Sequence, residues 1–306
     1  MSTTALVDLA SIPMPDAVEV LDYETILAAR KAGFVALYPE DQQAEVAATL
    51  ELESEPVARL LQESSYRELV WRQRANDAVR AVMLAYAEKA DLDNAGANLN
   101  VTRLVVTPAD DTTVPPTPAV MESDTDFRYR CQLSFQGYST AGSRGGYLFH
   151  SLSADGQVKD ASPTSPAPGV IVVYVMSRTG DGTAGDDLLK KVTAALSVED
   201  TRPMNDDVDV RSVSIVNYEV VAEIEMYDGP DGDAVINAAQ ADAEAYAESL
   251  HYIGKDVALS GFYKALHQPG AVKANISVPT NDIEISDGQT AFCTGITITK
   301  RIKPNA

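Results

Sequence analysis

The sequence predicts an α+β fold: an N-terminal helical region with a long helix, followed by tandem small α/β sheet-and-helix domains. Two observations carry this prediction. Apolar residues recur at helical spacing after Pro56, and nearly every residue of 169–177 is apolar or β-branched. Strand and helix patterns then alternate after residue 163, and the 306 residues suffice for two or three cores of ordinary size.

The first 21 residues are predicted to form an extended N-terminal arm, because Pro13 and Pro15 disfavour a helix there. Asp22 can cap a helix that runs from Tyr23 to about Tyr38. A shorter helix is expected over Glu40–Leu50, after the interruption at Pro39. The residues expected to be buried by the first helix are Ile26, Leu27, Phe34 and Leu37.

The longest helix is expected to begin at Pro56, since proline is tolerated in a first helical turn, and to end near Glu88. At 1.5 Å per residue it would be about 50 Å long, which is long for a domain of this size. Its apolar seam has the spacing of helices that pack lengthwise. Two interpretations stay open, a core helix or a strand of an intersubunit bundle. The predicted partner interface consists of Val57, Leu60, Leu61, Trp71, Ala75, Ala78 and Val82.

The helical region is predicted to extend from residue 22 to 120 and to finish with a strand and a proline-rich arm. The strand is Leu99–Thr107, and four prolines between residues 108 and 118 indicate a linker or arm. A helical middle segment is expected over 121–162, with a second short helix at Tyr147–Ser153. The face of its first helix is expected to hold Phe127, Cys131, Ser134, Phe135 and Tyr138.

Residues 163–306 are predicted to form the α+β part of the chain. The alternation of apolar residues at period two marks strands, and apolar residues at period 3.6 mark helices. The expected strands are Gly169–Ser177, Val208–Tyr227 (one long or two consecutive strands), Val272–Val278 and Gly295–Lys300. The expected helices are Asp186–Leu196, Ala234–Leu250 and Ser260–His267.

The formal net charge of −21 disfavours nucleic acid and anionic lipid as partners, because an acidic surface repels phosphates. No apolar run is long enough for a membrane-spanning helix, and the N-terminus lacks the basic and apolar regions of a signal peptide. Folding in a reducing cytoplasm is therefore expected. The two cysteines, Cys131 and Cys293, are expected to be buried free thiols rather than a disulfide.

The segment Gly180-Asp-Gly182-Thr-Ala-Gly185 has the GxGxxG pattern of a dinucleotide site, where glycines let the backbone approach a pyrophosphate. Three observations argue against that function. Two residues separate the strand from the first glycine, three aspartates would face the phosphates, and no series of parallel βαβ units is expected to follow. An acidic turn that caps a helix is the preferred interpretation, and a nucleotide-binding enzyme is the alternative.

No catalytic, cofactor-binding or metal-binding residue is predicted. Asp91–Gly96 begins like a calcium loop but has Ala95 and Thr102 at positions that need oxygen ligands, and DGPDGD at 228–233 also departs from the pattern. The three histidines, His150, His251 and His267, lack metal-ligand spacing and are expected at the surface or at helix ends.

Several long stretches carry a resemblance to a known family. They are LYPEDQQAEVAATLELESEPVARLLQE, YRELVWRQRANDAVRAVMLAYA, DLDNAGANLNVTRLVVTPAD, ESDTDFRYR, STAGSRGGYLFHSLSADGQVKD, SPAPGV, VEDTRPMNDDVDV and FYKALHQPGAV. In these stretches the chain resembles the baseplate J-like family of contractile-tailed temperate phages and R-type pyocins. The resemblance is colinear and covers nearly the whole chain, but it does not separate a phage from a pyocin-type particle.

This resemblance implies a structural wedge subunit of a contractile tail baseplate, assembled in the bacterial cytoplasm, and no enzyme. Family members form a six-fold ring around a central spike hub and relay the trigger for sheath contraction. The implied partners are I-like and W-like wedge proteins and neighbouring copies of the chain, with the hub and sheath as further candidates. The long helix would join a helix bundle, and residues 163–306 would contact the ring.

Overall fold

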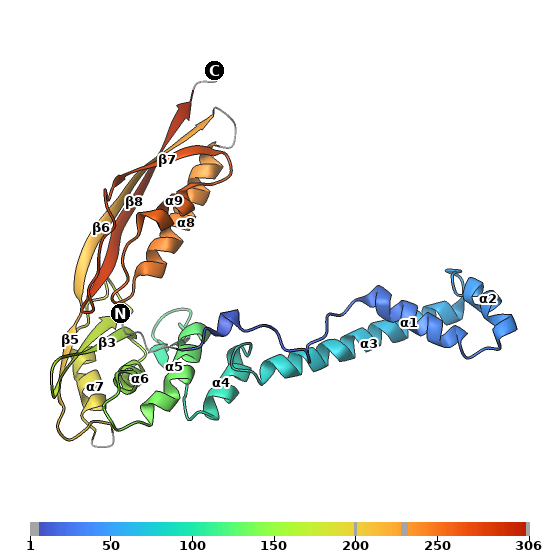
Figure 1. The fold of residues 1–306 in the computed structure, drawn as a ribbon, viewed down its shortest axis with the longest axis horizontal. Helices are drawn as coiled ribbons and strands as arrows, with labels where there is room; N and C mark the ends of the chain where they lie inside the picture. Colours follow the sequence, from blue (N-terminus) through green and yellow to red (C-terminus); the bar gives the residue numbers. More distant parts are fainter. Residues whose placement is uncertain (1–5, 199–200, 228–231, 304–306) are drawn as a thin grey trace. The chain divides into compact units, whose positions relative to one another are not determined.

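The computed structural model describes residues 6–198, 201–227 and 232–303 (Figure 1). These residues divide into two compact units. The helical unit covers Leu6–Thr102, and the sheet unit begins at Arg103. An α+β fold with an N-terminal helical region is therefore confirmed. The helical unit ends earlier than residue 120, because Arg103 forms an ion pair with Asp124 and donates to the carbonyl of Glu122 in the sheet unit.

The helical unit contains the short 3-10 helix η1 (Leu9–Ser11) and α1 (Tyr23–Val35), α2 (Glu40–Thr49), α3 (Pro56–Ala81) and α4 (Lys89–Ala97). Asp22 caps α1 as predicted, by accepting from the Thr25 amide. Ile26 and Leu27 are buried, Phe34 is half-buried and Leu37 is exposed. Burial of Leu37 was predicted wrongly, because α1 ends before that residue is reached.

Helix α3 has 26 residues and ends seven residues before the predicted Glu88, which makes it about 39 Å long. The chain turns after Val82, where the amide of Ala87 donates to the carbonyl of Met83. This turn buries Ala87 and lets the Tyr86 hydroxyl donate to the carbonyl of Ile12. Residues 82–88 include neither proline nor glycine, so their sequence would have allowed the helix to continue. Tertiary contacts therefore end it.

The segment after α4 also differs from the prediction. Only Val105–Thr107 forms a strand, β1, which pairs with β2 (Val120–Met121). The proline-rich residues between them form a hairpin loop, in which Asp110 and Thr117 exchange two backbone hydrogen bonds of 2.9 Å. The expected free arm is therefore closed by backbone pairing.

The first part of the sheet unit packs α5 (Asp124–Gly137), α6 (Arg144–Ala154) and α7 (Asp186–Leu196) with a three-stranded sheet of order β3-β4-β5. Strand β3 (Val158–Ala167) is antiparallel to β4 (Val170–Ser177), and β4 is parallel to β5 (Asp207–Ser212). Strand β3 begins at Val158, so its first residues lie inside the predicted helical segment 121–162. Helix α5 buries Phe127, Cys131 and Ser134. Of the same predicted face, Phe135 and Tyr138 are exposed, and Tyr138 follows the last helical residue.

The second part has a sheet of order β7-β6-β8, with helices α8 (Gly232–Leu250) and α9 (Leu259–Leu266) against it (Figure 1). Its strands are β6 (Ser214–Tyr227), β7 (Ala271–Val278) and β8 (Gln289–Lys303). The predicted strand Val208–Tyr227 is thus two strands in different sheets, with Val213 between them. The core contains alternate residues of β6, three alanines of α8 (Ala239, Ala243 and Ala247) and Phe262 of α9.

Candidate functional site

Helix α3 has an internal face and an outer face, and most of the predicted interface lies on the outer face. Trp71 is 73% exposed, Leu60 64% and Val82 78%. Ala75 and Ala78 are also exposed. We call Leu60, Trp71, Ala75, Ala78 and Val82 the exposed stripe. At 100° per residue these five side chains fall within about 60° of one another, so they lie on one side of the helix. Between Leu60 and Trp71 that side carries Ser64 and Arg67.

The other face of α3 packs inside the helical unit. Its buried residues are Ala58, Ser65 and Asn76, and α1 lies along it, held by an ion pair of 2.6 Å between Arg30 and Glu68. Val57 and Leu61, also predicted for the interface, are half-buried. The seven predicted residues therefore separate into five on the exposed stripe and two nearer the internal face.

The N-terminal arm is tied to the internal side of α3 by one buried amide. The side chain of Asn76 accepts from the Glu19 amide at 3.0 Å and donates to the Glu19 carbonyl at 2.8 Å. The Glu19 carboxylate pairs with Arg72 at 2.8 Å. Composition predicted an extended arm but could not predict this contact, since a single Asn in a helix has no distinctive spacing.

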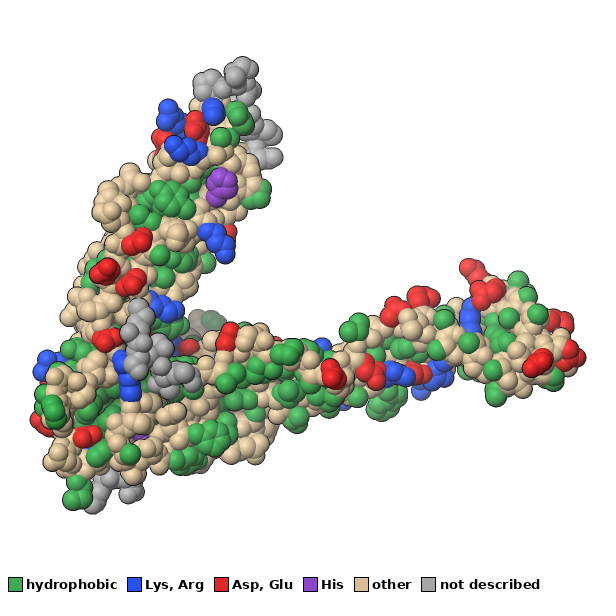
Figure 2. Space-filling view, viewed as in Figure 1, with side chains coloured by type: hydrophobic (Ala, Val, Ile, Leu, Met, Phe, Trp, Pro, Cys, Tyr) green, Lys and Arg blue, Asp and Glu red, His purple; other side chains and the backbone are tan. Residues whose placement is uncertain are grey.

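The charge of α3 differs from that of the chain. Between Pro56 and Ala81 there are five arginines and three acids, a balance of +2, in a chain of net charge −21. Figure 2 shows Lys and Arg side chains beside hydrophobic ones along α3, whereas acidic side chains are prominent at the end that holds α1 and α2. Helix α3 is thus locally basic, although arginines and glutamates both lie beside the exposed stripe.

In the glycine-rich loop Gly180–Gly185, the middle glycine is packed against other parts of the protein. Gly182 has a φ of 98°, and an added Cβ there would lie 3.0 Å from the Met176 methyl and 3.2 Å from His251 Nε2. The Asp181 carboxylate accepts from the Thr183 amide, and the Asp181 carbonyl is 3.1 Å from His251 Nε2. The loop connects β4 to α7 within one parallel unit, β4-α7-β5. The backbone is closely packed at Gly182 alone, since an added Cβ at Gly180 or Gly185 would meet no atom within 4 Å.

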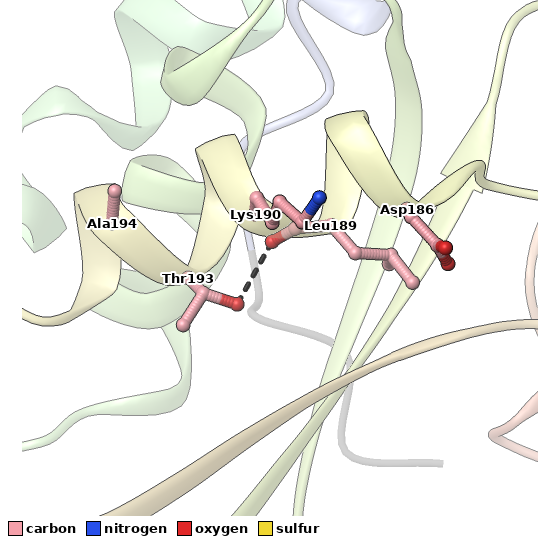
Figure 3. A pocket seen from close by; sticks show the side chains of 5 residues that line it. All are labelled: Asp186, Leu189, Lys190, Thr193 and Ala194. Carbon is pink, nitrogen blue, oxygen red and sulfur yellow. Dashed lines mark hydrogen bonds between the residues drawn. The ribbon is translucent and has the colours of Figure 1, made fainter.

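A shallow hollow on α7 is lined by residues of that helix alone, Asp186, Leu189, Lys190, Thr193 and Ala194 (Figure 3). The Thr193 hydroxyl already donates to the Leu189 carbonyl at 2.8 Å, and Lys190 lies 3.6 Å from Asp187. Figure 3 shows these side chains spread along the helix rather than converging on one point. The hollow has no arrangement that would orient a ligand.

A larger hollow, of about 590 Å³, surrounds Asp160 on β3. The Asp160 carboxylate accepts from the amides of Ala161 (2.8 Å) and Ile253 (3.0 Å), so it links β3 to the loop after α8. Burial raises the pKa of this carboxyl to about 6, against the lowering effect of the two amides. Tyr129 and Lys255 also line the hollow. No sequence pattern identified Asp160, because its burial depends on residues more than ninety positions away.

The histidines and cysteines have structural contacts. His150 Nε2 lies 3.0 Å from the Gly137 carbonyl. His251, which was expected at the surface or at a helix end, directly follows the last residue of α8 and is buried. Cys131 and Cys293 are free thiols; Cys131 is buried, which raises its pKa to about 11, and Cys293 is half-buried.

The calcium-like segment Asp91–Gly96 lies within α4 rather than in a loop, and residues 228–231 of the second one lie outside the described residues. Among the residues that the structure describes, no group of three or more His, Cys, Asp or Glu could hold a metal ion. None of the described helices is long and apolar enough to cross a membrane.

Comparisons with known proteins now give the family. Residues 53–110 match the baseplate J-like N-terminal domain, and residues 139–212 match the baseplate J-like central domain. The chain is 52% identical to baseplate protein J of Escherichia phage P2 over 289 residues, which covers 94% of this chain and 96% of that protein. A chain of the six-fold symmetrised anti-feeding prophage baseplate is similar over 58% of this chain and 44% of its own length, with 13% identity and a TM-score of 0.40. On the identity and coverage of the phage relative, the chain belongs to the baseplate J-like family.

Proposed function

We propose that this protein is a structural wedge subunit of a contractile tail baseplate, located in a virion or a tail-like particle and assembled in the host cytoplasm. The observation that carries the proposal is the identity of 52% along nearly the whole of a baseplate protein, without a large insertion or missing domain. The role is structural and requires no catalytic residue.

The exposed stripe supports a role in assembly. Isolated apolar residues are common on protein surfaces, but several exposed apolar side chains on one side of a long helix, among them a tryptophan, often mark an interaction site. Trp71, Leu60 and Val82 are exposed to solvent in the free subunit. Their burial by a partner helix would make the free energy of association more favourable. We therefore propose the exposed stripe as the surface that joins a helix bundle with other wedge proteins.

The finer features of the role follow from the family. In this proposal the chain assembles with I-like and W-like wedge proteins and with neighbouring copies into a six-fold ring around the spike hub. The sheet unit contacts the ring, and rearrangement of the ring relays the trigger for sheath contraction. Hub and sheath are further candidate partners.

The test is substitution of Trp71 by Glu in the full chain, co-expressed with the neighbouring wedge proteins. A carboxylate at this position cannot be desolvated in a bundle without an opposite charge, so co-purification should be lost. Circular dichroism should remain that of the folded chain, because Trp71 makes few internal contacts. Tyr66→Glu is the matched control: Tyr66 is 60% exposed on another side of α3 and should tolerate the change.

A folded Trp71→Glu protein that still co-purifies with its partners would rule out the exposed stripe as the assembly surface. A nucleotide-binding enzyme is tested separately by melting the protein with saturating NAD(P) or ATP. Binding to the folded state would raise the melting temperature by mass action, and no rise is expected.

A further inference from the structure

We infer that the two parts of the sheet unit are joined by a hinge at Val213, and that contacts of Lys159 and Asp160 with the second part latch this hinge. The first part ends with β5, and the second part begins with β6. We call the contacts of Lys159 and Asp160 with the second part the latch. The inference goes beyond the proposed function and does not depend on it, because it concerns contacts within one chain.

The backbone passes from one sheet to the other at the bond between Val213 and Ser214. The Val213 amide donates to the Val175 carbonyl of β4 at 3.1 Å, and the Ser214 amide donates to the Gly288 carbonyl just before β8 at 3.0 Å. Val213 is thus the last residue bonded to the first sheet, and Ser214 is the first one bonded to the second. The described elements of the first part all precede this bond and those of the second part all follow it, so rotation here moves each part as a whole.

Each part has a core of its own. The core of the second part is formed by buried residues between Tyr218 and Ala291. The first part buries Phe127 and Leu133 on α5 and Val173 on β4. Because close-packed interiors resist deformation, bending is expected between the two cores and not within either of them.

The latch consists of polar contacts. The Lys159 ammonium donates to the Glu248 carboxylate at 2.6 Å and lies 3.2 Å from His251 Nδ1. The Asp160 carboxylate accepts from the Ile253 amide at 3.0 Å. These bonds join β3, an outer strand of the first sheet, to the end of α8 and the residues after it. The Glu248 side chain is 71% exposed, so its pair with Lys159 contributes little free energy and can open at small cost.

Space for movement lies beside the latch. The hollow of about 590 Å³ around Asp160 is lined by both parts, with Tyr129 and Leu148 from the first and Tyr252 and Asp287 from the second. The two parts are therefore not close-packed against each other at this place. Polar, incompletely packed interfaces between domains permit relative motion, unlike a shared apolar core.

The experiment measures the distance between the two parts in the full chain. Spin labels are attached through Ala194→Cys on α7 and Thr297→Cys on β8, which are both exposed positions. Cys293→Ser removes the half-buried thiol, whereas Cys131 is buried and protected from the label. Double electron–electron resonance then gives the distribution of distances between the labels. In Lys159→Ala/Asp160→Ala this distribution should broaden and its mean should shift by more than about 2 Å.

The matched control is Asp155→Ala/Lys191→Ala. Asp155 accepts from the Gln157 amide at 2.8 Å and from Lys191 at 2.6 Å, and all three residues belong to the first part. The control thus removes a lysine pair and an amide bond without touching the latch, and it should leave the distance distribution unchanged. Glu248→Gln weakens the lysine pair alone from an exposed position and should broaden the distribution to a smaller extent.

The melting temperature of Lys159→Ala/Asp160→Ala should lie within about 4 °C of that of the control, because neither core is altered. A much lower melting temperature would show that the latch belongs to a shared core, and this would reject the hinge. An unchanged distance distribution in both latch variants would overturn the inference, and so would equal broadening in the control.

Discussion

Glu122 and Arg130 form an enclosed ion pair at 2.6 Å, with 3% and 4% of their side chains exposed. Glu122 also accepts from the Leu104 amide. Removing one member of a buried pair leaves an uncompensated charge. We expect Glu122→Ala to lower the free energy of unfolding by about 3–5 kcal/mol in urea titrations. The control Glu63→Ala, which breaks an exposed pair, should cost less than about 1 kcal/mol; equal effects would contradict this account.

Asp160 gives a prediction on pH. Its pKa in the folded state, about 6, lies above the ordinary value of 3.8, so the folded protein binds this proton more tightly than the unfolded chain. The free energy of unfolding contributed by Asp160 should therefore fall as pH rises from about 4 to about 6 and stay constant above. Asp160→Asn should remove this contribution. Parallel pH profiles of the wild-type and variant unfolding free energies would show that the prediction is wrong.

At the scale of single elements, α3 has one face for the arm and one for a partner. Asn76 makes both backbone contacts with Glu19, so Asn76→Ala leaves two backbone groups without these bonds. We expect faster hydrogen exchange of the Glu19 amide, which corresponds to a loss of about 1–3 kcal/mol in local stability. Gln73→Ala, which removes only an exposed bond to Asp77, is the control and should leave the exchange rate unchanged. Unaltered exchange in Asn76→Ala would show that other contacts hold the arm.

At the scale of the whole molecule, the two compact units divide between Thr102 and Arg103. We expect a fragment of residues 103–306 to fold alone, because it keeps the Arg103–Asp124 and Glu122–Arg130 pairs. A fragment that begins at residue 128 loses Glu122, Asp124 and the buried Phe127 and should aggregate or unfold at lower temperature. The melting temperatures of the two fragments are measured by circular dichroism. Similar melting temperatures would show that residues 103–127 do not stabilise the sheet unit.

Local sequence signals predicted many elements of this fold. The Asp22 cap, the uninterrupted apolar run that became β4 and the amphipathic pattern of α7 each depend on residues close in the chain, and the structure confirms them. The spacing of Trp71, Ala75, Ala78 and Val82 likewise indicated one helical face, and these residues share a face on α3. That this face binds a partner stays a prediction.

What the sequence by itself determined was thus the α+β class, most helices and strands, and, through its resemblance, the family. Only the tertiary structure decided that α3 ends at Ala81, that Val213 separates two sheets, and that the proline-rich loop closes a hairpin. It also decided which face of α3 is internal, that Glu122 is enclosed, and that Asp160 is half-buried at the hollow. The physical reason is that periodicity reports contacts within a few residues, whereas burial depends on side chains that the fold brings from distant positions.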